Sequence, residues 1–144
     1  MKIFLFVFCF IPLILTGQKD ELVVSRFEAF EQNSTINHLD VDKFNKIYVS
    51  TTNGLGIIGN LEDKPQFVLR GRSIIDVCFH DKHGTWAASS NAIFDIANEK
   101  EFLLPDNEAI IHGMDFYQQR LYIATNKGLF IRNMGTGKFE NLNT

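Results

Sequence analysis

Three residues that could bind a metal ion or a polar ligand recur at one spacing along the chain. His38, Asp76 and His112 each lie two positions after an isoleucine and ten positions before an aromatic residue. Imidazole and carboxylate groups are ligands for Zn²⁺ and related ions, and they also hydrogen-bond polar ligands and water. Because ligation needs a geometry that spacing alone does not give, three interpretations stay open: a metal site, a ligand-binding polar ring, and satisfied structural positions. We predict a channel-lining, ligand-binding role for these residues, no firm metal site and no cofactor.

The three residues belong to a threefold internal repeat, whose copies begin at Ile36, Ile74 and Ile110. These starts are 38 and 36 residues apart. Twelve positions after its first isoleucine each copy has an aromatic residue, followed at intervals of three by a hydroxyl residue and a small residue. The three columns are Tyr48, Trp86 and Tyr122, then Thr51, Ser89 and Thr125, then Gly54, Ala92 and Gly128. Such self-similarity at a fixed period indicates one supersecondary unit repeated three times.

Short β-prone runs separated by turn residues fill each copy. In the first copy they predict strands over Ile36–Val41, Lys46–Ser50, Leu55–Gly59 and Gln66–Leu69, and the other copies end near Phe102–Leu104 and Lys138–Leu142. Asn53-Gly54 lies between two apolar runs, as in a tight hairpin. A repeat of this length with four antiparallel strands is typical of one β-propeller blade. The alternatives are weaker, because a helical repeat needs a periodicity that is missing and a β-sandwich does not explain the regular spacing.

The repeated columns have expected structural roles. On the second strand of a blade the aromatic residues are expected to pack between blades, although a sugar-stacking platform is the alternative. The hydroxyl residues are expected to hydrogen-bond the backbone at the hairpin turn. Where Ala92 replaces the turn glycine, we predict a strained turn or another turn type.

The N-terminal residues 1–17 are predicted to be a cleaved signal peptide. Lys2 precedes the apolar run Ile3–Leu15, and Gly17 provides a small residue at the cleavage position. The run spans about 20 Å as a helix, which is short of the roughly 30 Å membrane core. We therefore expect a periplasmic or secreted mature chain that does not insert into a membrane. Cleavage leaves Cys78 as the only cysteine, and its apolar neighbours place it in a core.

The remaining chain divides into an N-terminal segment and three repeats. Residues 18–35 are predicted to hold a linker and one unpaired outer strand within residues 22–30, and the repeats span residues 36–73, 74–109 and 110–144. The predicted fold is therefore all-β, a partial β-propeller of three four-stranded antiparallel blades with one extra N-terminal strand. Propellers close with four to eight blades. Three explanations stay open: missing blades in a longer chain, a homo-oligomer in which two copies give six blades, and a decayed open array.

Residues 42–55 (DKFNKIYVSTTNGL), 85–93 (TWAASSNAI) and 121–129 (LYIATNKGL) resemble the two-component-regulator propeller repeat. The sequence departs from that repeat in two ways: Tyr replaces Trp in the first and third copies, and the acidic position at Asp42 becomes His80 and Phe116. The resemblance implies a periplasmic sensor propeller of the kind that precedes a membrane helix and a histidine kinase and is associated with glycans or other extracellular ligands.

Composition and motifs narrow the function classes. The chain has 144 residues, 45% of them hydrophobic and 22% charged, with a net charge of −3. These values indicate a globular domain and exclude a strongly basic nucleic-acid-binding surface. The sequence has no nucleophile elbow, zinc-protease helix, Walker A loop or C-x-x-C pair. We predict a non-enzymatic, exported ligand-binding segment, the N-terminal part of a larger two-component sensor. The alternative is an envelope or secreted interaction scaffold that oligomerises through open blade edges.

Overall fold

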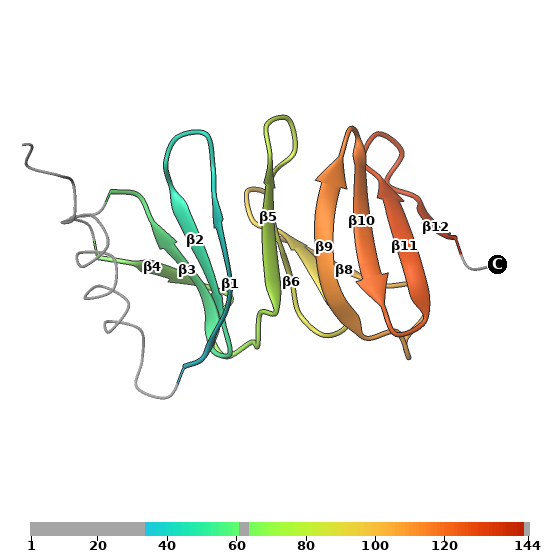
Figure 1. The fold of residues 1–144 in the computed structure, drawn as a ribbon, viewed down its shortest axis with the longest axis horizontal. Coiled ribbons are helices and arrows are strands. Elements are labelled where there is room, and N and C mark those ends of the chain that lie inside the picture. The colour runs from blue at the N-terminus through green and yellow to red at the C-terminus, as the bar shows by residue number, and fades with distance from the viewer. Residues whose placement is uncertain (1–33, 61–63, 143–144) are drawn as a thin grey trace, which may run out of the picture.

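The computed structural model describes residues 34–60 and 64–142, and all regular secondary structure in these residues is β-strand (Figure 1). Within these ranges there is no helix with the length and apolar character needed to cross a bilayer. The predicted signal peptide and the predicted strand within residues 22–30 lie outside the described residues.

Twelve strands form three separate four-stranded antiparallel sheets, each built from consecutive strands (Figure 1). Blade 1 consists of β1 (Ile36–Val41), β2 (Ile47–Thr51), β3 (Gly54–Ile58) and β4 (Gln66–Val68). Blade 2 consists of β5 (Asp76–His80), β6 (Gly84–Ala88), β7 (Ala92–Asp95) and β8 (Lys100–Leu103). Blade 3 consists of β9 (Ile111–Tyr117), β10 (Arg120–Thr125), β11 (Gly128–Asn133) and β12 (Phe139–Asn141). The predicted all-β fold with three four-stranded blades is confirmed, and it fits a partial propeller.

The blades pack face to face, and an apolar core lies between each neighbouring pair. Between blades 1 and 2, Tyr48 and Leu55 contact residues of the second blade that include Val77 and Phe94. Between blades 2 and 3, the indole of Trp86 lies in a cluster with residues of both sheets. The first strands of the blades, β1, β5 and β9, are the inner strands. Along them and their partners successive side chains alternate between the two faces of the sheet, and in blade 2 both faces form interblade cores. Blade 2 is buried on both faces.

The hydroxyl residues at the ends of β2 and β10 hold the hairpins that follow. Thr51 Oγ1 donates to the Gly54 carbonyl at 2.8 Å and accepts from the Asn53 N–H at 3.1 Å. Thr125 makes the same pair of bonds with Gly128 and Lys127. Both glycines have positive φ, 133° and 107°, which L-residues with a side chain rarely adopt.

The middle repeat closes this turn differently. Ser89 Oγ lies 3.4 Å from the Ala92 carbonyl, the longest of the three equivalent bonds. Ala92 does not adopt a positive φ. The turn at Ala92 is therefore of another type, one of the two alternatives that its sequence left open.

The first hairpin of blade 3 is one residue shorter than those of the other blades. Asp40 pairs with Tyr48 and Cys78 pairs with Trp86, an offset of eight residues in both cases. In blade 3 the offset is seven, because Asp115 pairs with Tyr122. The β9–β10 loop is a tight two-residue turn in which Gln118 has a φ of 56°. The shorter loop moves β9 by one residue relative to β1 and β5. Blades 1 and 3 have an irregularity at the same level, and the offset persists beyond it, since Thr51 pairs with Ile36 whereas Thr125 pairs with Ile111.

A substitution at Gly54 tests the geometry of the β2–β3 turn. A Cβ at this position would lie 3.0 Å from the Val68 carbonyl oxygen and would require a φ of 133°. We expect Gly54→Ala to lower the free energy of unfolding by about 2–3 kcal/mol, because backbone strain and the close approach add. Gly71 is the control, since its φ is 77° and a Cβ added there would have no heavy atom within 4 Å; Gly71→Ala should lose about 1 kcal/mol. Urea unfolding measures both, and equal losses would contradict the steric argument.

Candidate functional site

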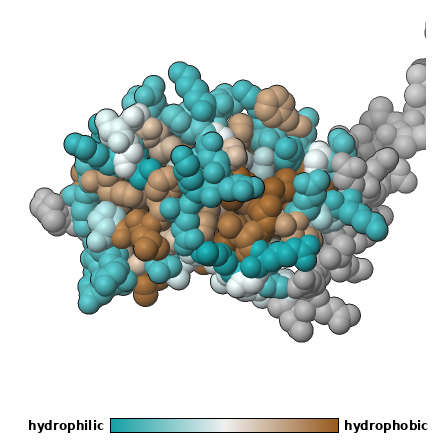
Figure 2. Space-filling view, turned by 180° about the vertical axis from the view of Figure 1, so that it is seen from behind, coloured by the Kyte–Doolittle hydropathy of each residue, from teal (hydrophilic) through white to brown (hydrophobic). Residues whose placement is uncertain are grey.

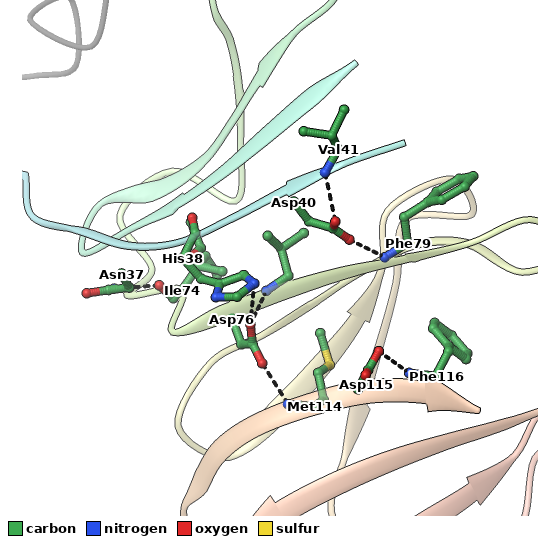
Figure 3. Close-up of polar contacts among 12 residues, drawn as sticks. Asn37, His38, Asp40, Val41, Ile74, Asp76, Phe79, Met114, Asp115 and Phe116 are labelled. Carbon is green, nitrogen blue, oxygen red and sulfur yellow. Dashed lines mark hydrogen bonds and ion pairs between the residues drawn. The ribbon is translucent and has the colours of Figure 1, made fainter. Parts of the chain in front are cut away.

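The structure brings two of the three predicted polar residues together. His38 on β1 and Asp76 on β5 lie side by side, with Nε2 to Oδ1 at 3.6 Å (Figure 3). The His38 side chain is half exposed, whereas Asp76 is buried. His112 is exposed on β9. Because β9 is shifted by one residue, Gly113 rather than His112 is level with His38 and Asp76. In residues 34–60 and 64–142 no three potential ligand side chains gather at one point to hold a metal ion.

The Asp76 carboxylate connects blade 2 to blade 3. Its Oδ1 accepts from the Val77 N–H on its own strand at 2.9 Å, and its Oδ2 accepts from the Met114 N–H on β9 at 2.6 Å (Figure 3). Bonds to a buried, ionised acceptor are the stronger kind of protein hydrogen bond. Both carboxylate oxygens are thus engaged: Oδ1 bonds its own strand and Oδ2 holds β9 against β5.

Asp40 makes the equivalent connection between blades 1 and 2. Its Oδ1 accepts from Val41 N–H and its Oδ2 accepts from Phe79 N–H on β5, both at 2.7 Å (Figure 3). We call this arrangement the carboxylate latch. One carboxylate oxygen accepts a hydrogen bond from the N–H of the next residue on the same strand, and the other accepts from an N–H on the inner strand of the following blade. Asp40 and Asp76 occupy different columns of the sequence repeat, so the repeat does not align the two latches.

A cleft of about 290 Å³ lies between blades 1 and 2. Its residues are Val68, Leu69, Arg72, Phe94, Asp95, Ile96, Glu99, Lys100 and Glu101. Arg72 spans the blades through two parallel bonds to Glu101, at 2.8 and 3.0 Å. Its guanidinium also lies 5.0 Å from the centre of the Phe94 ring. The polar groups of Arg72 and Glu101 therefore already satisfy each other.

A second cleft, of about 250 Å³, lies between blades 2 and 3 and is rich in basic groups. Its residues are Lys82, His83, Trp86, Asp95, Asn98, Lys100, Phe102, Arg132 and Met134. The Arg132 guanidinium lies 3.9 Å from the Phe102 ring centre and donates to the Gly137 carbonyl at 2.9 Å. Within the part of the chain that the structure describes, Arg132 Nε and His83 Nε2 are buried nitrogen atoms without a hydrogen-bond partner. We refer to this region as the basic cleft.

Burial shapes the ionisation of the groups around this cleft. Desolvation lowers the pKa of Arg132, and the nearby Asp95 charge acts in the opposite direction. The pKa of His83 is lowered by desolvation and then by the positive charges of His80 and Lys82. The His80 and His83 rings stack with their centres 4.9 Å apart. A neutral His83 beside cationic Arg132 gives the cleft a net positive character.

Cys78 lies between blades 2 and 3. Burial, reinforced by the negative charges of Asp76 and Asp115, raises the pKa of its thiol. Since the thiolate is the reactive form, Cys78 acts as a small apolar core residue.

The aromatic column divides between two environments. Tyr48 is buried between blades 1 and 2, and Trp86 is buried between blades 2 and 3. Tyr122 has no third interface to enter among the described residues and is only partly buried. The two buried rings fill interblade cores and are not available for stacking with a sugar.

No protein-family model and no curated protein matches this sequence. The fold does match solved structures. PorZ, described as an essential bacterial surface component of the type-IX secretion system of Porphyromonas gingivalis, matches with a TM-score of 0.60 and 16% identity over 75% of this chain and 16% of its own. The extracellular domain of the putative one-component system BT4673 of B. thetaiotaomicron matches at 0.59 and 17% identity, over 74% and 16% of the two chains. A second structure, described as the extracellular domain of the putative hybrid two-component system BT4673, matches at 0.54 and 16%, over 80% and 17%.

These similarities establish a shared fold. The chain spans less than a fifth of the length of each of these three proteins. The three-blade unit therefore corresponds to a small portion of each larger structure.

The latch can be tested at Asp76. We expect Asp76→Asn to lower the free energy of unfolding by about 1.5–3 kcal/mol, because an amide nitrogen cannot accept one of the two N–H bonds. Asp81→Asn is the matched control, since Asp81 is exposed and forms a surface ion pair with Lys43; it should change stability by less than about 0.5 kcal/mol. Equal effects in urea unfolding would show that the latch does not hold the blades.

The basic cleft predicts a pH dependence. Since the folded-state pKa of His83 is below the unfolded value of about 6.5, the unfolded chain binds the proton more readily. Stability is therefore greatest above about pH 6.5 and decreases as pH falls from there toward the folded pKa. We expect His83→Gln to reduce this slope between about pH 7 and 5.5. An unaltered slope in the His83 variant would contradict the assignment.

Proposed function

We propose that this chain is a non-catalytic recognition segment of an exported, sensor-type β-propeller. The observation that supports this most directly is the three-blade fold, which is shared with extracellular domains of a one- or two-component system over 74–80% of the chain. The repeat motifs, which resemble the two-component-regulator propeller repeat, point in the same direction. Periplasmic or secreted localisation follows from the N-terminal sequence, and a place near the start of a larger sensor follows from that resemblance.

The ligand that we propose is an anionic oligosaccharide, bound at the basic cleft. Lys82, Lys100 and Arg132 face a single carboxylate, Asp95, in this cleft. Sugar carboxylates are well matched by such cationic groups, and aromatic edges and amide groups suit the sugar ring and hydroxyls. The predicted channel residues His38 and Asp76 are less suited to this role, because the Asp76 oxygens are occupied by backbone N–H groups.

A thermal-stability titration tests this function. We expect trigalacturonate to raise the melting temperature of the chain in a saturable manner, by mass action on the folded state, and neutral maltotriose to have no effect. Lys100→Ala should weaken trigalacturonate binding about tenfold, an energy of roughly 1.4 kcal/mol. Lys127→Ala, at the β10–β11 turn and outside the residues that line the cleft, is the matched charge control and should bind normally.

The same titration separates this function from the scaffold alternative. A scaffold would show a melting temperature that rises with protein concentration and does not respond to either sugar. That result, together with equal behaviour of the Lys100 and Lys127 variants, would contradict ligand recognition at the basic cleft.

A further inference from the structure

One face of blade 3 repeats the face of blade 1 that packs against blade 2. The strand registers place Tyr122, Leu129 and Ile131 level with Tyr48, Leu55 and Ile57. In blade 1 these positions build an interblade core, in which Tyr48 is 6% and Leu55 is 0% exposed. In blade 3 Tyr122 and Leu129 are only partly buried, whereas Ile131 is 2% exposed. We call the side of blade 3 that carries Tyr122, Leu129 and Asp115 the open face.

The surroundings of Tyr122 are hollow and partly apolar. A shallow depression on the open face is lined by Asp115, Phe116, Tyr117 and Tyr122. Tyr117 is 65% exposed. Seen from behind the view of Figure 1, the molecule carries exposed apolar surface in patches separated by polar side chains (Figure 2). Large exposed rings beside a strand edge are typical of a surface that a partner covers.

Asp115 on the open face is half of a carboxylate latch. It pairs with Tyr122 as Asp40 pairs with Tyr48, so the two carboxylates are level in their blades. Asp115 Oδ1 accepts from the Phe116 N–H at 2.7 Å, which matches the bond from Val41 to Asp40 (Figure 3). Asp40 Oδ2 crosses to the next blade. Among the residues that the structure describes, Asp115 Oδ2 has no hydrogen-bond donor.

The two complete latches show which backbone N–H a neighbouring strand would have to donate to Asp115 Oδ2. Each carboxylate accepts from the residue one step further along the neighbouring inner strand: Asp40 from Phe79, and Asp76 from Met114. On each receiving strand the preceding residue is Cys78 or Gly113, neither of which carries a carboxylate. The receiving N–H is therefore free to bond across to the previous blade.

The first blade of a second copy does not meet this requirement. On β1 the corresponding N–H is that of Val41, which already donates to Asp40 Oδ1. The far side of blade 1 carries the side chains of Leu39 and Val41, which are 47% and 52% exposed, beside the buried Val49 and Ile58. Head-to-tail pairing of two copies would therefore leave Asp115 Oδ2 without a donor from β1, because the Val41 N–H is already bonded.

We propose that the open face binds a further propeller blade, other than blade 1 of a second copy. Its inner strand lies beside β9 as β5 lies beside β1, and it has a residue other than Asp level with Asp115. The backbone N–H after that residue donates to Asp115 Oδ2, and the sheet covers Tyr122 and Leu129. This inference depends on the blade geometry and is independent of ligand binding at the basic cleft.

A four-blade fusion tests the proposal with a blade whose sequence meets the requirement. A copy of residues 72–109 joined after Thr144 places a second blade 2, with the residue corresponding to Cys78 level with Asp115. We expect the fusion to unfold in one transition at a higher temperature than the parent chain. Asp115→Asn should then lower the melting temperature of the fusion by about 3–8 °C and that of the parent by less than about 1 °C.

A matched fusion carries a copy of blade 1, residues 34–73, in which the copied Asp40 satisfies its own strand. Here Asp115→Asn should have no more effect than in the parent. The proposal is wrong if the blade 2 fusion is no more stable than the parent, or if Asp115→Asn acts equally in all three proteins. Sedimentation equilibrium of the parent chain tests whether a second copy binds the open face. A dimer that Asp115→Asn dissociates would overturn the choice of partner.

Discussion

The arrangement of these blades depends on how the inner strands satisfy their outward-facing N–H groups. β1, β5 and β9 belong to three separate sheets and share no backbone ladder, so each is an edge strand with donors directed at the neighbouring blade. A buried donor without an acceptor loses about 1–3 kcal/mol. A short side chain with two acceptor oxygens solves this problem, because it can bond its own strand and the next strand at once. Aspartate at Asp40 and Asp76 does so.

The latch sets the register between blades as well as their separation. Both complete latches connect a carboxylate to the N–H one residue further along the next strand, although they occupy positions two residues apart. The same latch geometry can therefore form at positions two residues apart along the inner strands. Level with Asp40 on β5, the residue is Cys78, which carries no carboxylate that could occupy the Phe79 N–H. On β9, Gly113 leaves room for Asp76, because a Cβ at Gly113 would lie 3.3 Å from Asp76 Oδ2. The identities of the small residues and of the carboxylates are thus coupled across the interface.

Much of the fold could be predicted from the sequence, and the reason is the local nature of blades. β1 has the predicted bounds, and no end of β2, β3 or β4 differs from its predicted position by more than one residue. This agreement arises because hairpin turns such as Thr51–Gly54 are encoded by neighbouring residues. The alignment of candidate site residues was less secure. It placed His112 level with Asp76, whereas the two-residue turn at Gln118 puts Gly113 there. The length of a hairpin loop changes which residues pair without changing the strand-forming sequence pattern. Counting residues from the aromatic column could therefore not detect the shift of β9.

The same register shift explains why Asp40 and Asp115 were not recognised as equivalents. In the sequence repeat Asp40 aligns with Met114, and only the paired strands bring Asp40 and Asp115 to one level. With Asp40 and Asp115 at the same level, the polar groups separate into two kinds. The carboxylates of Asp40 and Asp76 accept bonds from backbone N–H groups and hold the blades. The charged groups of Arg132 on β11 and Lys100 on β8 instead face an interblade cleft. Recognition of an external ligand is physically better placed at that outer cleft, because binding there does not require breaking a bond on which blade packing depends.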